Sequence, residues 1–185
     1  MDTTESPSNL GRITDRLALY AQQISPSTSP HQSKPTSTSN KQPKMAARDP
    51  ITCHCLNTLS GTPAANLPVT LTLLSPSNTA NPATFRATTN ADGRVATWTP
   101  VGTASASQSV PAILAALPAA DSKTNWSVRF DVGPWYEAQG VESFWPEVEV
   151  KFTVKGRGKE GEEGWKHYHV PVLLGPWNYS TYRGS

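Results

Sequence analysis

The chain has 185 residues, with 16 Lys and Arg against 14 Asp and Glu, so its net charge is +2. This near-neutral balance supplies no basic field for nucleic acid. No stretch approaches the roughly 20 apolar residues that a membrane helix needs, and no apolar signal-peptide core follows Met1.

The first 45 residues are expected to form an extension to a single domain. Residues 10–24 have the apolar spacing of a short amphipathic helix, with Thr14 or Asp15 as its N-cap. Residues 25–44 are Ser, Thr, Pro, Lys and Gln with almost nothing apolar, a composition that predicts a disordered linker. The sequence therefore predicts an N-terminal extension at 1–45 and one domain at 46–185.

Alternation of apolar and polar side chains dominates the domain, and it is typical of strands with one buried face. It is clear over 68–74, 126–132 and 147–154, and further strands are expected at 51–57, 84–89, 93–98, 168–174 and 179–182. About eight short strands predict an all-β sandwich of two antiparallel sheets. One short helix is expected at 135–139, between Pro134 and Gly140. Residues 102–124 and 155–166 are predicted to be solvated loop insertions, the first with room for a helical turn at 112–117.

The same alternation predicts where the histidines of the domain point. The face with Ile51, Cys53 and Cys55 suits the core, which places His54 on the opposite face. In the strand at 168–174, Tyr168 and every second residue after it form the face that suits the core. His167 and His169 therefore share the other face. Cys53 and Cys55 are two residues apart in one strand, a poor geometry for a disulfide, which favours a reducing, intracellular setting.

Taken singly, each candidate side chain has an ordinary structural explanation. A lone histidine is usually a surface or satisfied core residue, Arg94 can be a solvated charge at a strand end, and Tyr182 and Arg183 can be interface residues. The histidines could together offer three nitrogens to a metal, but the two cysteines point away from His54, and no Asp or Glu lies close in sequence to complete a site. A Ser-His-Asp triad lacks the Gly-x-Ser-x-Gly elbow.

Four blocks of the sequence resemble the 5-hydroxyisourate hydrolases, the enzyme branch of the transthyretin-like proteins. They are residues 51–64, the turn Thr89-Asn-Ala-Asp-Gly-Arg94, residues 130–132 with 142–147, and residues 169–174 running on to Tyr182-Arg-Gly-Ser185. That tetrapeptide is specific to the enzyme branch, and transthyretin itself lacks it. Asn57 and Gly175 depart from the family pattern, and the insertion at 102–124 is longer than usual.

The resemblance implies a transthyretin-like (prealbumin) sandwich and a set of site residues. The residues at the family's catalytic positions are His54, Arg94, His169 and Ser185. Those at the positions that contact substrate are His54, Arg94 and Tyr182, while His167 occupies a flanking position. The resemblance implies no metal and no organic cofactor, and a homotetramer, a dimer of dimers with active sites at subunit interfaces.

The activity that the resemblance implies is hydrolysis of 5-hydroxyisourate to 2-oxo-4-hydroxy-4-carboxy-5-ureidoimidazoline in urate catabolism. Water attacks a ring carbonyl and opens a cyclic amide, which needs a base, an oxyanion stabiliser and a proton for the leaving nitrogen. Neutral imidazole can serve as the base, and a permanently charged arginine can stabilise the anion. The alternatives are a non-catalytic transthyretin-like small-molecule binding protein and a structural β-sandwich.

The sequence leaves two cellular locations open, the cytoplasm and the peroxisome. The chain ends in Arg-Gly-Ser, which is not a peroxisomal address of the Ser-Lys-Leu type. Residues 16–24 partly resemble a type 2 peroxisomal signal, in Arg16-Leu17 and Gln23, whereas Tyr20 and Ile24 depart from it. A short helix without a targeting role explains the segment equally well.

Overall fold

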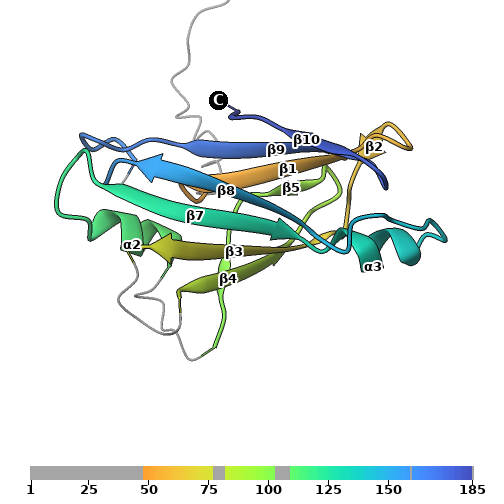
Figure 1. The fold of residues 1–185 in the computed structure, drawn as a ribbon. Helices are drawn as coiled ribbons and strands as arrows, with labels where there is room; N and C mark the ends of the chain where they lie inside the picture. Colours follow the sequence, from red (N-terminus) through yellow and green to blue (C-terminus); the bar gives the residue numbers. More distant parts are fainter. Residues whose placement is uncertain (1–47, 77–81, 103–108, 159, 185) are drawn as a thin grey trace, which may run out of the picture. The chain divides into compact units, whose positions relative to one another are not determined.

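The computed structural model describes residues 48–76, 82–102, 109–158 and 160–184. The helix expected at 10–24, the linker at 25–44 and the last residue, Ser185, lie outside this part of the chain. The described residues form ten strands and two short helices (Figure 1). Among them, no helix is long and apolar enough to span a membrane.

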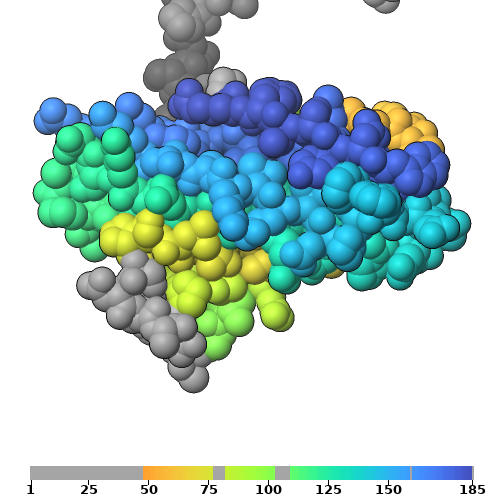
Figure 2. Space-filling model, in the orientation of Figure 1, coloured from red at the N-terminus to blue at the C-terminus, as the bar shows by residue number. Residues whose placement is uncertain are grey.

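One sheet of five strands carries His54, Arg94 and His169. Its strands are β1 (Ile51–Asn57), β2 (Thr62–Pro63), β5 (Arg94–Val95), β9 (Tyr168–Leu174) and β10 (Tyr179–Thr181). The order along the sheet is β10-β9-β1-β2, and β5 also pairs with β1. In the space-filling view, the C-terminal strands run in dark blue along one surface of the molecule (Figure 2).

The second sheet also has five strands, in the order β6-β4-β3-β7-β8. They are β3 (Pro68–Ser75), β4 (Thr84–Thr88), β6 (Thr99–Pro100), β7 (Lys123–Phe130) and β8 (Val148–Lys155). All pairs within this sheet are antiparallel. The two sheets form the two layers visible in Figure 1, so the all-β sandwich expected from the alternating segments is confirmed.

One strand pair departs from the antiparallel prediction. β1 and β9 run parallel, with Thr52 aligned with His169 and Cys53 with Val170. No hairpin joins them, because the chain between them builds the second sheet before β9 returns beside β1. Parallel neighbours need such a long connection. The alternation of side chains is the same in both kinds of ladder, so the faces predicted for each strand remain correct.

The core lies between the sheets and is filled by the inward side of each alternating strand. Ile51, Cys53 and Cys55 of β1 are buried there, as are Val170 and Val172 of β9. Both cysteines are free. Burial raises the pKa of both thiols, to about 12 for Cys55. They are therefore protonated near neutral pH and serve as small apolar core residues.

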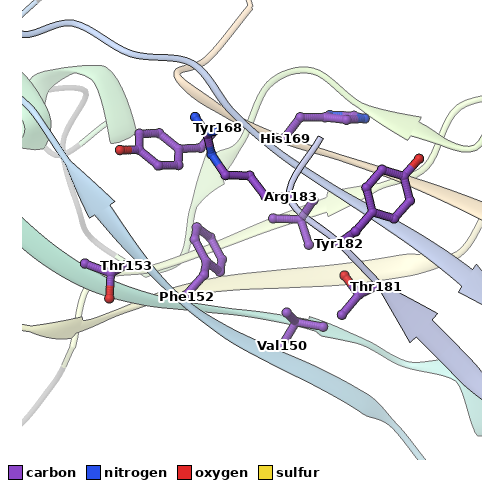
Figure 3. A pocket seen from close by; sticks show the side chains of 9 residues that line it. Val150, Phe152, Thr153, Tyr168, His169, Thr181, Tyr182 and Arg183 are labelled. Atoms are coloured by element: carbon purple, nitrogen blue, oxygen red, sulfur yellow. The ribbon is translucent and has the colours of Figure 1, made fainter. Parts of the chain in front are cut away.

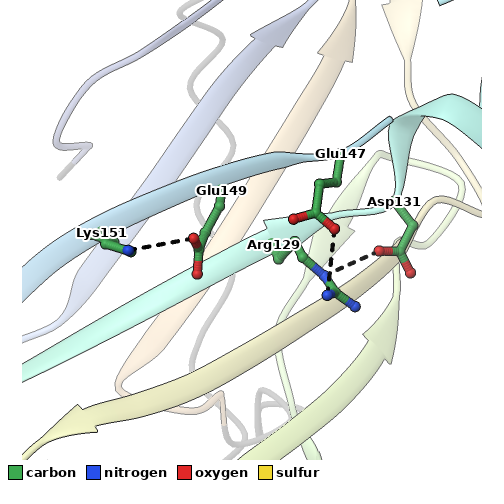
Figure 4. Close-up of polar contacts among 5 residues, drawn as sticks. All are labelled: Arg129, Asp131, Glu147, Glu149 and Lys151. Carbon is green, nitrogen blue, oxygen red and sulfur yellow. Dashed lines mark ion pairs between the residues drawn. The ribbon is translucent and has the colours of Figure 1, made fainter. Parts of the chain in front are cut away.

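The outward face of the second sheet is polar. Arg129 on β7 forms ion pairs with Asp131, at 3.3 Å, and with Glu147, at 3.4 Å (Figure 4). Lys151 on β8 pairs with Glu149 at 3.7 Å. These groups are partly or largely exposed, so water screens the pairs, and each contributes little to stability.

The described residues contain two helices where one was expected. Helix α3 spans Val132–Glu137, so it begins earlier than the predicted 135–139, with Pro134 in its first turn. Helix α2 spans Val110–Ala115 inside the first insertion, and its N-cap Ser109 accepts a hydrogen bond from the N–H of Ala112. Strand β7 takes up Lys123 and Thr124 from the same insertion, because they pair with Lys155 and Val154 of β8. The segment at 102–124 is therefore partly ordered structure rather than loop alone.

Candidate active site

The outward face of β1 and β9 gathers three imidazole rings. The rings of His54 and His169 are stacked with centroids 6.4 Å apart, and those of His169 and His167 with centroids 6.2 Å apart. The parallel register brings β1 beside β9, and the period of two turns His54 and His169 away from the core. His169 is thus the central ring of a row of three.

A turn places Arg94 beside this row. The side-chain oxygen of Asn90 accepts hydrogen bonds from the N–H groups of Asp92 and Arg94, at 3.0 and 2.9 Å. Gly93 has a φ of 71°, and a Cβ there would collide with the carbonyl oxygen of Cys55. The turn delivers Arg94 into register with His54 across the β1–β5 pair. Cross-strand partners share one face, so this guanidinium belongs to the same surface as the imidazoles.

Thr52 connects two of the three rings. Its hydroxyl oxygen lies 2.8 Å from Nδ1 of His169 and 3.0 Å from Nε2 of His167. Thr52 is aligned with His169 in the parallel pair and is only 6% exposed. A single hydroxyl therefore fixes the orientation of both rings.

A cavity of about 170 Å³ opens beside these groups. Its lining residues are Arg48, Thr52, Cys53, Arg94, Val95, Ala96, His167 and His169. Arg48 lies just before β1, and its neighbour Asp49 holds this part of the chain in place. The N–H of Asp49 donates to the carbonyl oxygen of Ala96, and its Oδ2 accepts from the N–H of Trp98, both at 2.8 Å. The cavity therefore has two arginines and two imidazoles around its wall.

Burial and the nearby arginines lower the pKa of all three imidazoles. Burial, followed by the charge of Arg94, lowers the pKa of His169 to about 4, and the other two histidines and Arg48 act in the same direction. Burial and Arg94 also lower the pKa of His54, against a hydrogen bond to the backbone of Asp92. Burial and Arg48 lower the pKa of His167, which Glu160 opposes. All three rings are thus biased towards the form that can accept a proton.

The C-terminal segment folds over the face of His169. β10 pairs with β9 through Thr181, and the same register continues to Gly184, which lies opposite His169. The ladder is interrupted between these points, where Tyr182 faces Pro171, a residue without an N–H. The hydroxyl of Thr181 donates to the carbonyl of Pro171 at 2.9 Å instead.

Alternation along this segment separates Tyr182 from Arg183. Tyr182 shares the side of His169 and is 61% exposed, whereas Arg183 turns towards Tyr168, with its guanidinium carbon 5.5 Å from the ring centroid (Figure 3). A second, mostly apolar cavity of about 270 Å³ lies here, between Phe152 of β8 and Tyr182, and His169 borders it too. His169 is therefore the residue shared by both cavities.

Of the residues expected to form a site, the structure brings His54, Arg94 and His169 together, and His167 joins them. Tyr182 lies near His169 but borders the second cavity rather than the one that Arg94 lines. Ser185 lies outside the described residues. Among the described residues, no three His, Cys, Asp or Glu side chains are grouped as metal ligands would be.

Sequence reasoning did not identify Thr52 and Arg48 as site residues. Thr52 had a usable signal, because it precedes His54 by two positions and so shares its face. Arg48 lies before the first strand, where no period applies, and only the hydrogen bonds of Asp49 bring it to the cavity.

Comparison with known proteins places the chain in one family. Residues 51–184 match the model of the HIUase/Transthyretin family, where HIUase denotes 5-hydroxyisourate hydrolase. A Schizosaccharomyces pombe protein named probable 5-hydroxyisourate hydrolase is 36% identical over 137 residues, covering 73% of this chain and 90% of that protein. The Mus musculus 5-hydroxyisourate hydrolase is 35% identical over 136 residues, covering 74% and 95%. Transthyretin from Sparus aurata, at 20% identity, shares the fold with a TM-score of 0.50 over 74% of this chain and 97% of that chain.

Proposed function

We propose a function on the premise that this chain belongs to the HIUase/transthyretin family: it is a hydrolase that opens 5-hydroxyisourate to 2-oxo-4-hydroxy-4-carboxy-5-ureidoimidazoline in urate catabolism. The observation that carries the proposal is the convergence of two neutral imidazoles with one arginine on the outward face of β1, β5 and β9. The substrate is the one that the names of the S. pombe and mouse relatives state.

The roles of the residues follow from their protonation. His54 and His169 have lowered pKa values, so near pH 7 both can take a proton from water. General acid–base assistance of this kind is worth roughly 10²–10⁴-fold in rate. Arg94 remains charged and can hold the oxyanion that forms when water attacks the ring carbonyl. We assign the first two to proton transfer and Arg94 to binding the substrate and its developing charge.

Tyr182 and Ser185 are proposed to complete the substrate pocket. Tyr182 is exposed on the side of His169, with its ring free of the core, so it can close over a molecule bound at that imidazole. Ser185 follows Gly184, whose N–H bonds to the carbonyl of His169. We assign Ser185 to the pocket because the residue before it lies against His169.

A homotetramer is proposed because large apolar side chains remain exposed on the strands and turns of the sheet that carries the site. Leu173 on β9 and Trp177 in the following turn are 39% and 65% exposed, and Leu59, after β1, is 51% exposed. Large exposed apolar side chains are a feature of surfaces that bind another protein. A second copy of the chain would cover them and enclose the row of histidines between subunits.

The main alternative is a binding protein of the transthyretin type without catalysis. The enzyme is favoured by the imidazoles, because a carrier needs shape and apolar contact but no proton acceptors held neutral beside an arginine. The test is to generate 5-hydroxyisourate with urate oxidase and follow its ultraviolet absorbance. We expect purified protein to accelerate its disappearance. A rate equal to spontaneous decay would support the binding protein instead.

Location in the cytoplasm or the peroxisome is proposed from residues 16–24, which lie outside the described part of the chain. Fusing residues 1–45 to a fluorescent protein separates the two. Punctate signal that overlaps a peroxisomal marker would indicate a type 2 signal, and diffuse signal would indicate the cytoplasm.

A further inference from the structure

Thr52 has a buried hydroxyl that lies between two imidazoles. This position indicates a role in the chemistry of the site as well as in packing. Its oxygen lies within hydrogen-bond distance of Nδ1 of His169 and Nε2 of His167, at 2.8 and 3.0 Å. We propose that Thr52 is a positioning residue of the hydrolase site, which sets the tautomer of His169 and transfers protons between His169 and His167. This inference rests on the proposed function, because it assigns His169 a proton to pass on.

The single proton of the Thr52 hydroxyl couples the tautomers of His169 and His167. A threonine hydroxyl has one proton, so it can donate only one hydrogen bond, and it accepts with its lone pairs. The hydroxyl oxygen could accept from both rings, but its own proton would then have no acceptor among the described residues. All the protons are used when one ring donates to Thr52 and Thr52 donates to the other. In that arrangement, when Nδ1 of His169 carries its proton, Thr52 donates to Nε2 of His167. In that state Nε2 of His169, on the far side of the ring from Thr52, has a free lone pair.

In the forward step each proton moves one position, from water towards His167. A water oxygen forms a bond to the substrate carbonyl carbon, and one water proton passes to Nε2 of His169. The Nδ1–H bond of His169 breaks as its proton joins the oxygen of Thr52. The original hydroxyl proton of Thr52 passes to Nε2 of His167. His169 and Thr52 end neutral, His167 is a cation, and the negative charge lies on the former carbonyl oxygen.

The reverse transfer supplies the proton that the leaving nitrogen needs. The carbon–nitrogen bond breaks, and the nitrogen takes the proton from Nε2 of His169. His169 regains a proton on Nδ1 from Thr52, and Thr52 regains one from His167. Each residue returns to its starting form. One imidazole can therefore act as base and then as acid without exchanging protons with the solvent.

The surroundings favour His167 as the place where the proton rests. His169 lies nearer the centre of positive charge, because Arg94, Arg48 and both other histidines disfavour its protonated form. At His167 the carboxylate of Glu160 opposes the effects of burial and Arg48. The cation is thus better tolerated at the outer ring than at the central one.

The test compares Thr52→Val with Thr52→Ser. Valine has the shape of threonine and suits a strand, so the fold should persist, while serine restores the hydroxyl. We expect Thr52→Val to lower kcat about tenfold or more, a part of the 10²–10⁴-fold that acid–base assistance is worth, with KM little changed and Thr52→Ser close to wild type. Thr72→Val makes the same chemical change on β3 of the other sheet and should leave kcat unaltered.

Two further measurements distinguish proton transfer from packing. His167→Phe should lower kcat as Thr52→Val does, and the double variant should be no slower than the slower single variant, since both interrupt one path. Nitrogen-15 NMR of the unliganded protein should show His169 with its proton on Nδ1 in wild type and a changed tautomer population in Thr52→Val. Additive losses, an unchanged tautomer, or a Thr52→Val protein with full kcat would overturn the proposal. Wild-type protein that does not accelerate hydrolysis would instead overturn the proposed function, whatever the tautomer.

Discussion

The N–H of Gly184 donates a hydrogen bond to the carbonyl oxygen of His169 at 3.0 Å, so the end of the described chain lies directly against the central imidazole. The absence of a side chain at this glycine permits the approach. A Cβ at position 184 would lie 2.7 Å from Cδ2 of His169 and 3.0 Å from Cγ of Pro171. The tail and the histidine are therefore fitted to each other through one glycine.

Gly184→Ala should reduce activity more than stability. The added methyl group must displace either the ring of His169 or the tail, and a displaced base transfers protons less well. We expect kcat/KM to fall several-fold in the absorbance assay while the melting temperature changes little, because the core lies on the other side of β9. Ser180→Ala, an exposed change on the same segment, is the matched control and should retain activity. Full activity in Gly184→Ala would show that the close contact has no catalytic consequence.

Replacing either of the two histidines proposed to transfer protons should remove most of the activity. His54→Asn and His169→Asn keep a polar side chain of similar reach but cannot act as a base near pH 7. We expect each to lose on the order of 10²–10⁴-fold in kcat, with the circular dichroism spectrum and the oligomeric state unchanged. A double variant that is fully active would rule out both residues as the proton-transfer groups.

The stability of the fold should decrease as the pH is lowered through a window set by the pKa of His169. Its pKa drops from 6.5 to about 4 on folding, so between these values the unfolded chain binds more protons than the folded one. Stability contributed by neutral His169 is therefore complete above pH 6.5 and is lost as pH falls towards 4. His54 and His167 shift in the same direction. In urea unfolding, the midpoint urea concentration should decrease as the pH is lowered from 6.5 to 4. The decrease should be smaller in His169→Asn. An equal fall in both proteins would mean that His169 is not held neutral by the fold.

The proposed tetramer predicts that a charged substitution has different effects on assembly at two leucines with similar exposed fractions. Leu173 on β9 is 39% exposed on the site face, and Leu74 on β3 is 38% exposed on the other sheet. A glutamate at an apolar interface would bury an unpaired charge. Leu173→Glu should therefore yield a smaller assembly by light scattering after size exclusion, while Leu74→Glu should not. The same mass for wild type and Leu173→Glu would argue against this face as the subunit interface.

Strand positions and faces were predictable because they depend on local alternation. The pattern through Ile51, Cys53 and Cys55 predicted the outward direction of His54, and the structure confirms it. The pattern around Asn90 and Gly93 likewise predicted the turn before Arg94. In each case the information lies within a few neighbouring residues.

Relationships between distant segments were not predictable in the same way. The parallel alignment of Thr52 with His169 depends on which strands meet, and alternation is identical for parallel and antiparallel partners. The bridge from Thr52 to two rings depends on that register. Helix α2 was indicated only as a turn, because the surrounding Ala and Ser residues carry little apolar periodicity.

The most direct test of the account is catalysis by substoichiometric protein. Freshly made 5-hydroxyisourate in large excess over the protein should disappear faster than in buffer, in proportion to protein concentration, and through many turnovers per chain. The product should be the ring-opened ureidoimidazoline, and protein with both His54→Asn and His169→Asn should decay at the buffer rate. Removal of no more substrate than the protein can bind, or equal rates for wild type and the double variant, would contradict the account.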